Sequence, residues 1–236
     1  MLIFTILLLA GIVTQLADAS EEDEVARGVR FVCAEIAKDT PETLQLLTSK
    51  GMASVPLSVR SPGAMFHVPA DGVVRLGLKS GKEDSFITYA VATIPDGVIS
   101  ATAILFPLNH KRADISYRIL FVDDASVTGG DVYFLNTLDR RCAVRLDSTE
   151  LILLSGQPMI YRSKRNKESY NAVMAISVEQ DSPELGKKWE LITASTWRLM
   201  PTRIEICIIY MNHLYQRPTI KGLTFFPDVG IKGKRN

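Results

Sequence analysis

The sequence predicts an all-β protein made of two tandem immunoglobulin-like antiparallel β-sandwich domains. Two observations lead to this fold class. From residue 28 onward, short runs of β-branched and aromatic residues alternate with Gly, Pro, Asn and Asp, which is typical of strands separated by turns. Several groups of residues also recur in the same order at nearly one spacing, which favours a duplicated domain.

Most of the chain is divided into short predicted strands. These strands cover residues 28–33, 64–68, 73–78, 87–94, 101–106, 117–122, 132–135, 142–146, 172–178, 190–193, 204–210 and 222–226. In the segment from Ile204 to Tyr210 every second residue is large and apolar, so one face of that strand is expected to be buried. Residues 41–47 fit a capped helix and a strand equally well, and both interpretations stay open.

The recurring groups are two strands and a polar pair. Residues 29–32 match residues 132–135, and Asn109-His110 matches Asn212-His213, each pair following an apolar strand. Both copies then pass through a polar loop into a further apolar strand. Because turns and binding sites are both copied by duplication, the Asn-His pairs are predicted either as a repeated surface site or as strand-end turns.

The repeat sets the domain boundaries. The first β-sandwich domain is expected at residues 26–125 and the second at residues 128–229, with a basic tail at residues 230–236. Each domain has about the 100 residues of an immunoglobulin-like sandwich. The Cys-Trp-Cys signature of true immunoglobulin domains is absent, so the expected likeness is one of architecture.

Residues 1–19 are predicted to be a cleavable signal peptide. The first sixteen residues carry no charged side chain, and Ala17 and Ala19 supply small residues before an acidic stretch. Cleavage after Ala19 would export the protein to the periplasm or the extracellular space and leave no stable transmembrane span. An uncleaved anchor, which needs about 20 apolar residues, is the alternative. No basic residue precedes the apolar run, so a start other than Met1 also stays open.

The net charge bears on which partners are expected, and the sequence around the cysteines bears on whether the thiols are buried or bridged. The formal net charge of +1 gives no electrostatic reason to expect nucleic acid. Cys33 and Cys142 each share a strand face with apolar residues, which predicts buried thiols. A bridge from Cys142 to Cys207 is an open alternative, since an exported protein can form disulfides.

Catalytic and cofactor motifs are missing from the sequence. No nucleophile elbow, calcium loop, P-loop or dinucleotide fingerprint occurs, and no cofactor is predicted. His67 lies inside a predicted strand, where a structural role is favoured. A copper site at Cys207, Met211 and His213 has unsuitable spacing. Asp123-Asp124 is the best carboxylate pair for glycoside hydrolysis, although a solvated turn explains it as well.

The densest basic cluster is predicted at a hairpin tip. It lies between residues 159–162 and 170–178 and consists of Arg162, Lys164, Arg165 and Lys167. Such a tip could contact an anionic polymer or lipid headgroup, or it could be a solvated turn.

Several segments together resemble a group of uncharacterised secreted β proteins of bacteria. The segments that carry the resemblance are residues 29–32, 68–72, 117–124, 132–136, 189–192 and 195–197. The resemblance implies an exported β protein with two tandem domains, and it brings no catalytic residue. We therefore expect a non-enzymatic protein that binds or scaffolds an unknown protein or envelope polymer through loops or sheet faces. A carbohydrate-active hydrolase with paired carboxylates is the alternative.

Overall fold

The computed structural model describes residues 27–81, 85–112, 115–163, 168–182, 184–212 and 215–226. Regular structure in these ranges is β-strand throughout, apart from one 3-10 turn, η1 Asp124–Ser126. The prediction of an all-β protein is therefore confirmed. No helix in the described ranges is long and apolar enough to cross a membrane. The predicted signal peptide and basic tail lie outside the described residues.

The first half of the chain forms one eight-stranded sheet with the order β3-β2-β5-β6-β8-β7-β1-β4. A single parallel bridge between Ala90 and Tyr117 joins its two groups of four strands. The whole sheet is curved and nearly closed, like a barrel. Its strands are β1 Gly28–Cys33, β2 Thr43–Thr48, β3 Gly51–Pro56, β4 Phe66–His67, β5 Val73–Lys79, β6 Phe86–Thr93, β7 Ser100–Arg112 and β8 Ile115–Asp123.

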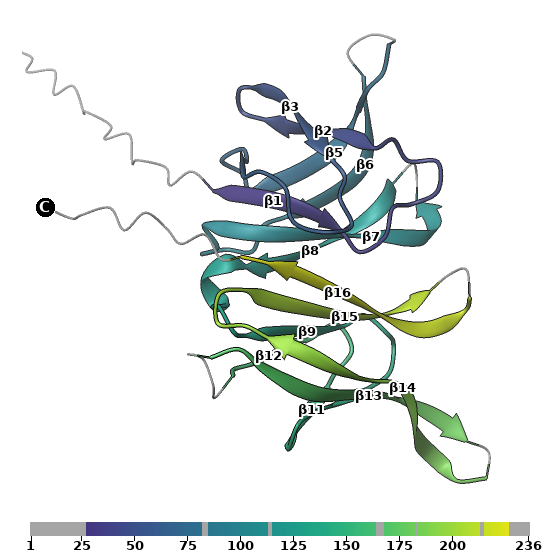
Figure 1. Cartoon of the computed structure of the whole chain (residues 1–236). Helices are drawn as coiled ribbons and strands as arrows, with labels where there is room; N and C mark the ends of the chain where they lie inside the picture. Colours follow the sequence, from purple (N-terminus) through teal and green to yellow (C-terminus); the bar gives the residue numbers. More distant parts are fainter. Residues whose placement is uncertain are drawn as a thin grey trace, which may run out of the picture.

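The second half forms two four-stranded sheets with the orders β11-β10-β13-β14 and β12-β9-β15-β16. In Figure 1 this half lies below the first, with β9, β15 and β16 nearest to β7 and β8. Its strands are β9 Val132–Asn136, β10 Cys142–Leu146, β11 Thr149–Leu153, β12 Pro158–Tyr161, β13 Tyr170–Ser182, β14 Gly186–Leu199, β15 Ile204–Asn212 and β16 Arg217–Phe225.

Strand pairing follows the same order in both halves. β1 pairs in parallel with β7 and antiparallel with β4, just as β9 pairs in parallel with β15 and antiparallel with β12. The order β3-β2-β5-β6 likewise corresponds to β11-β10-β13-β14. The difference is that the Ala90–Tyr117 bridge joins the two groups of strands in the first half, whereas they are separate sheets in the second.

Three hydrophobic cores hold the fold together. The N-terminal core lies inside the first sheet and includes Phe31 and Leu76, and the C-terminal core lies between the two later sheets and includes Phe134. The interface core joins the two halves. It consists of Val32, Ala34, Ile104, Phe106, Val122, Val127, Tyr133, Leu135, Ile204, Ile206, Ile208, Leu223 and Phe225.

The interface core explains why some strands are apolar on both faces. Every residue of β1 and of β9 is buried, because one face of each strand packs into the core of its own half and the other packs against the opposite half. Such strands read as continuous apolar runs rather than alternating ones. The predicted apolar face from Ile204 to Tyr210 is confirmed, and it packs in the interface core.

Two sequence-based expectations change. Residues 43–48 form the strand β2, in which Leu44 and Leu46 are buried in the N-terminal core; this excludes the helical interpretation. The hairpin expected between residues 159–162 and 170–178 is wrong, because β12 pairs with β9 in one sheet and β13 pairs with β10 and β14 in the other. Turn-favouring residues in a sequence do not determine whether the chain crosses from one sheet to another.

Candidate functional site

A cavity of about 880 Å³ opens at one end of the first half. Four chain segments line it: Arg27 before β1, the turn between β2 and β3, the segment 65–70 around β4, and residues 97–99 before β7. Its volume is within the range of about 300–1,000 Å³ that is usual for small-molecule sites. The cavity is therefore large enough for a ligand, and it is assembled from residues far apart in sequence.

Backbone hydrogen bonds hold these segments in place. The Gly28 amide donates to the Ile99 carbonyl (2.7 Å), and the Val68 amide donates to the Arg27 carbonyl (3.1 Å). Gly28 also pairs with His67 across β1 and β4. Three of the four lining segments are thus tied together through two consecutive residues, which indicates a cavity formed before any ligand arrives.

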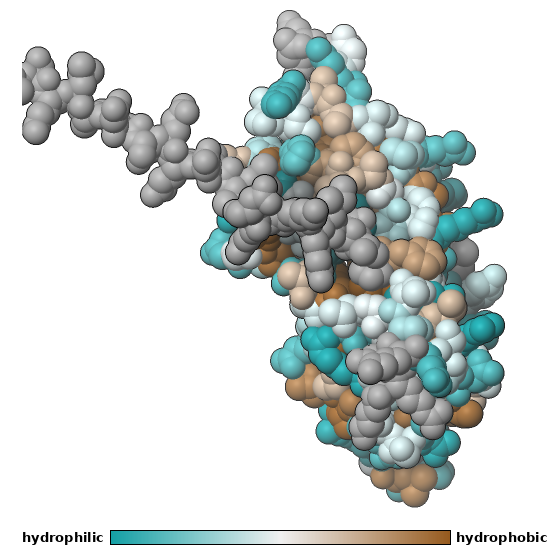
Figure 2. Space-filling view, turned by 60° about the vertical axis from the view of Figure 1, so that its left-hand side comes forward, coloured by the Kyte–Doolittle hydropathy of each residue, from teal (hydrophilic) through white to brown (hydrophobic). Residues whose placement is uncertain are grey.

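Much of the lining is apolar. Phe66 packs against Phe31 of the N-terminal core, with ring centroids 6.0 Å apart, while Val68 is buried beside it. Met65 and Ile99 are 38% and 58% exposed, respectively, although both are large apolar residues. Figure 2 shows that hydrophobic side chains come to the surface on both halves of the molecule. At the cavity, such exposure is expected of residues that contact a ligand.

Among the described residues, the charged groups of the lining are all basic. Arg27 and Lys50 line the cavity together with His67, and no described Asp or Glu is part of the lining. Within the described ranges, none of the three makes an ion pair. The guanidinium of Arg27 lies against Gly72, where a Cβ atom would be 2.7 Å from Nη1. The cavity therefore combines apolar walls with basic groups that have no acidic partner among the described residues.

Asn109 and Asn212, the first residues of the repeated Asn-His pairs, lie in the corresponding strands β7 and β15. Asn109 and His110 fall within β7, and Asn212 is the last residue of β15, where its Oδ1 accepts a hydrogen bond from the Tyr215 amide (3.1 Å). This contact is the turn chemistry expected at a strand end. The side chains of Asn109 and His110, and the whole of His213, lie outside the described structure.

Arg162 has partners within the chain. Its guanidinium donates to the Asp131 carboxylate and to the Ser126 carbonyl (2.9 Å), and Asp131 is buried. These contacts tie the end of β12 to the segment that joins the two halves. The rest of the predicted anion-contact cluster, Lys164, Arg165 and Lys167, lies outside the described residues.

The carboxylate of Asp124 is also engaged internally. It accepts hydrogen bonds from Arg30 (2.9 Å), Ser100 (2.7 Å) and Thr102 (2.8 Å). Neighbouring Asp123 caps η1 by accepting from the Ala125 amide. Both carboxylates thus have structural contacts, which favours a structural role over glycoside hydrolysis.

The cysteines are free and buried. Cys33 lies in the N-terminal core and Cys142 in the C-terminal core, which confirms the prediction of buried thiols for these two residues. Cys207 is also buried in the C-terminal core and forms no bridge to Cys142. Burial raises the pKa of Cys33 and of Cys142 to about 12, which keeps both thiols protonated and unreactive near neutral pH. In the described part of the chain, no three His, Cys, Asp or Glu side chains are grouped to hold a metal ion.

Comparison with models of protein families and with curated proteins finds no match for this chain. The candidate site therefore rests on geometry. Sequence reasoning missed Arg27 and Lys50 and expected a structural role for His67, since no motif joins these residues. Their signal is spatial, because β1, β4 and the β2–β3 turn meet only in the folded sheet.

Proposed function

We propose that this chain is an exported, non-enzymatic binding protein that holds a small, largely apolar molecule in the cavity next to β1 and β4. The cavity carries the proposal: it has ligand size, a hydrogen-bonded frame and large apolar side chains open to solvent. The described lining has no Asp or Glu, which supports binding rather than glycoside hydrolysis, a reaction that needs two carboxyl groups about 5 to 10 Å apart.

The proposal includes two tandem β-sandwich domains with immunoglobulin-like architecture. The shared pairing order of β1–β8 and β9–β16 supports the duplication. Equivalent strands also divide their faces in the same way: Phe31 and Phe134 pack into the core of their own half, while Val32 and Leu135 pack in the interface core. In this scheme the first domain carries the ligand and the second gives it a rigid support.

Export is supported by the apolar, uncharged N-terminal stretch followed by small residues. We expect protein recovered outside the cytoplasm to begin at Ser20. N-terminal sequencing of the mature protein tests this, and a mature chain that begins at Met1 would contradict the export proposal.

Ligand binding is tested with the neutral fluorescent probe N-phenyl-1-naphthylamine. The wild-type protein is expected to bind it saturably, and Ile99→Trp, which fills the cavity mouth, should weaken binding at least tenfold. Leu185→Trp is the matched control, because Leu185 is 75% exposed on the other half of the chain. Unchanged probe binding in Ile99→Trp would exclude the cavity as the site.

A further inference from the structure

The basic groups of the cavity define the chemistry of its ligand. Three chain segments bring Arg27, Lys50 and His67 to one lining, and no carboxylate of the described residues joins them there. Lys50 and His67 are exposed and Arg27 is partly exposed, so all three side chains are solvated and accessible to a molecule that enters the cavity. Two cations and an imidazole beside apolar walls, with no carboxylate among the described lining residues, favour an anion as the charged part of the ligand.

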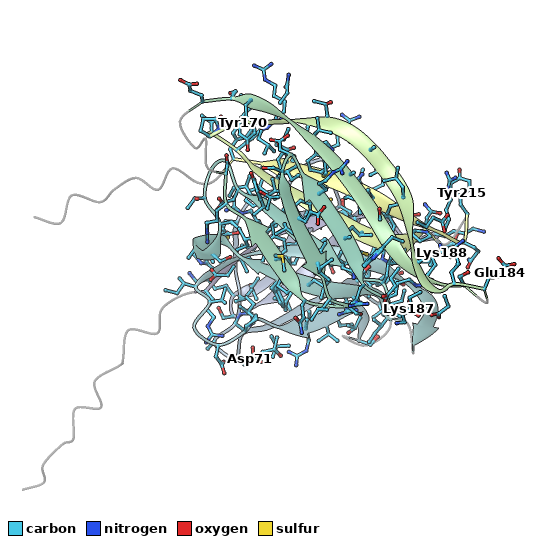
Figure 3. The ribbon with its side chains drawn as sticks, turned by 90° about the horizontal axis from the view of Figure 1, so that it is seen from below. Asp71, Tyr170, Glu184, Lys187, Lys188 and Tyr215 are labelled. Atoms are coloured by element: carbon cyan, nitrogen blue, oxygen red, sulfur yellow. The ribbon has the colours of Figure 1, made fainter. Side chains whose placement is uncertain are left out.

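Asp71, in the turn that follows the lining segment 65–70, already has contacts of its own. Asp71 accepts a hydrogen bond from the Val73 amide (2.9 Å) and lies 3.9 Å from the Arg75 guanidinium. Figure 3 places Asp71 on the side of the molecule away from the tip of the β13–β14 hairpin. Asp96 precedes the lining residues 97–99 but is not itself part of the lining. Neither the Asp71 nor the Asp96 carboxylate is therefore part of the cavity lining.

The backbone positions of the cations are held by the fold. Hydrogen bonds on both sides of the Arg27–Gly28 peptide fix the base of the Arg27 side chain, and its guanidinium rests on Gly72. The Lys50 amide donates to Thr48 Oγ1 (3.3 Å), which itself donates to the Gly51 carbonyl (2.9 Å). A hydrogen-bonded strand start and a hydrogen-bonded turn therefore fix the backbone at the two cations, which limits the entropy lost when an anion binds.

We propose that the cavity ligand is an amphipathic acid: an apolar tail against Phe66, Met65 and Ile99, with one anionic headgroup held by Arg27, Lys50 and His67. This inference rests on the proposed function. The shared chemistry is an anion on an apolar chain, and the headgroup can be a carboxylate or a phosphate monoester.

Four ligands with the same twelve-carbon tail test the inference by calorimetry, each below its micelle concentration: dodecanoate, dodecyl phosphate, dodecanol and dodecyltrimethylammonium. At least one acid is expected to bind tenfold or more tightly than dodecanol, and the ammonium compound should bind most weakly. The stronger of the two acids identifies the headgroup. If dodecanol binds as tightly as both acids, the inference is overturned while the proposed function stands. If no tail binds, the proposed function itself fails.

Variants separate recognition from structure. Arg27→Gln and Lys50→Gln are each expected to weaken binding of the preferred acid about tenfold and to leave dodecanol binding unchanged. Arg60→Gln and Lys188→Gln, both outside the lining, should change neither. An equal loss of acid and alcohol binding would show that the cations only support the fold, and would overturn the inference.

Discussion

At the scale of single residues, Asp124 joins strands that are distant in sequence. The Asp124 carboxylate accepts hydrogen bonds from Arg30 of β1 and from Ser100 and Thr102 of β7. The Arg30 guanidinium also lies over the Phe225 ring, 5.6 Å from its centroid. The Arg30 and Asp124 side chains are only 10% and 13% exposed, so loss of one charge leaves the other desolvated and without its counter-ion.

Asp124→Asn is therefore expected to lower the free energy of unfolding by about 3 kcal/mol. Urea denaturation followed by circular dichroism measures the loss. Asp96→Asn, at an exposed loop position, is the control and should change stability by less than about 0.5 kcal/mol. Equal midpoints for the two variants would show that the Asp124 contacts do not stabilise the fold.

Glu179 provides a pH-dependent contact on the outer face of β13. Hydrogen bonds from Arg141, together with Lys187, hold the pKa of this carboxyl below its usual value. A depressed pKa means that the stabilisation is present above the ordinary glutamate pKa and is lost as pH falls through the lower folded value.

Glu179→Gln should consequently be less stable than wild type at pH 7, and the difference should shrink at pH 3. Urea midpoints at the two pH values test this. Glu184→Gln is the matched control, since Figure 3 shows Glu184 near Lys187 and Lys188 at the same hairpin end. If the stability difference between Glu179→Gln and wild type were the same at pH 7 and pH 3, the ion pair would not be its cause.

At the scale of elements, a bulge between β5 and β6 depends on one glycine. The pairing register shifts between Leu76 and Gly77, and a Cβ atom on Gly77 would lie 2.0 Å from the Ile87 carbonyl oxygen. The clash is with backbone, so no side-chain rotation relieves it. Glycine at a bulge is commonly there because another strand approaches closely.

Gly77→Ala is expected to destabilise the protein by about 2 kcal/mol or more, because the β5–β6 pairing must separate. Gly81→Ala, where nothing lies within 4 Å of the added Cβ, should be neutral within about 1 kcal/mol. Thermal melts of the two variants compare them directly. A Gly77→Ala protein as stable as Gly81→Ala would mean that the strands can shift apart without loss.

At the scale of the whole molecule, the interface core joins the two halves. Apolar residues of β1, β7 and β8 pack against those of β9, β15 and β16. Because the interface core buries its apolar area only while both halves are folded and in contact, unfolding of one half exposes part of the other. Both tryptophans, Trp189 and Trp197, lie in the second half and report on its unfolding.

Leu76→Ala in the N-terminal core should therefore shift the tryptophan fluorescence transition of the other half. The free energy of unfolding is expected to fall by about 2 to 5 kcal/mol, because Leu76 is buried in that core. The fluorescence and circular dichroism transitions should coincide. Met52→Ala, which removes a side chain that is 45% exposed, should have little effect. An unmoved fluorescence midpoint, with two steps in circular dichroism, would show that the halves unfold independently.

The sequence alone was sufficient for the all-β class, for the exact bounds of β1 and β10, and for the buried faces of Cys33, Cys142 and Ile206. These features are local, because side-chain alternation and turn residues act within a few positions of the chain. The strands β3 and β11 were not predicted, since Met52 and Ile152 face solvent and weaken the apolar pattern.

Tertiary structure decided everything that depends on which strands meet. Arg30 contacts Asp124 although the two residues are 94 positions apart in sequence. β12 and β13 are consecutive in the chain but belong to different sheets. The cavity also depends on strand pairing, since Arg27, Lys50 and His67 line one cavity only when β1 pairs with β4 beside the β2–β3 turn. Local patterns determine which residues form strands, whereas the burial of whole sheet faces determines their partners and hence the site.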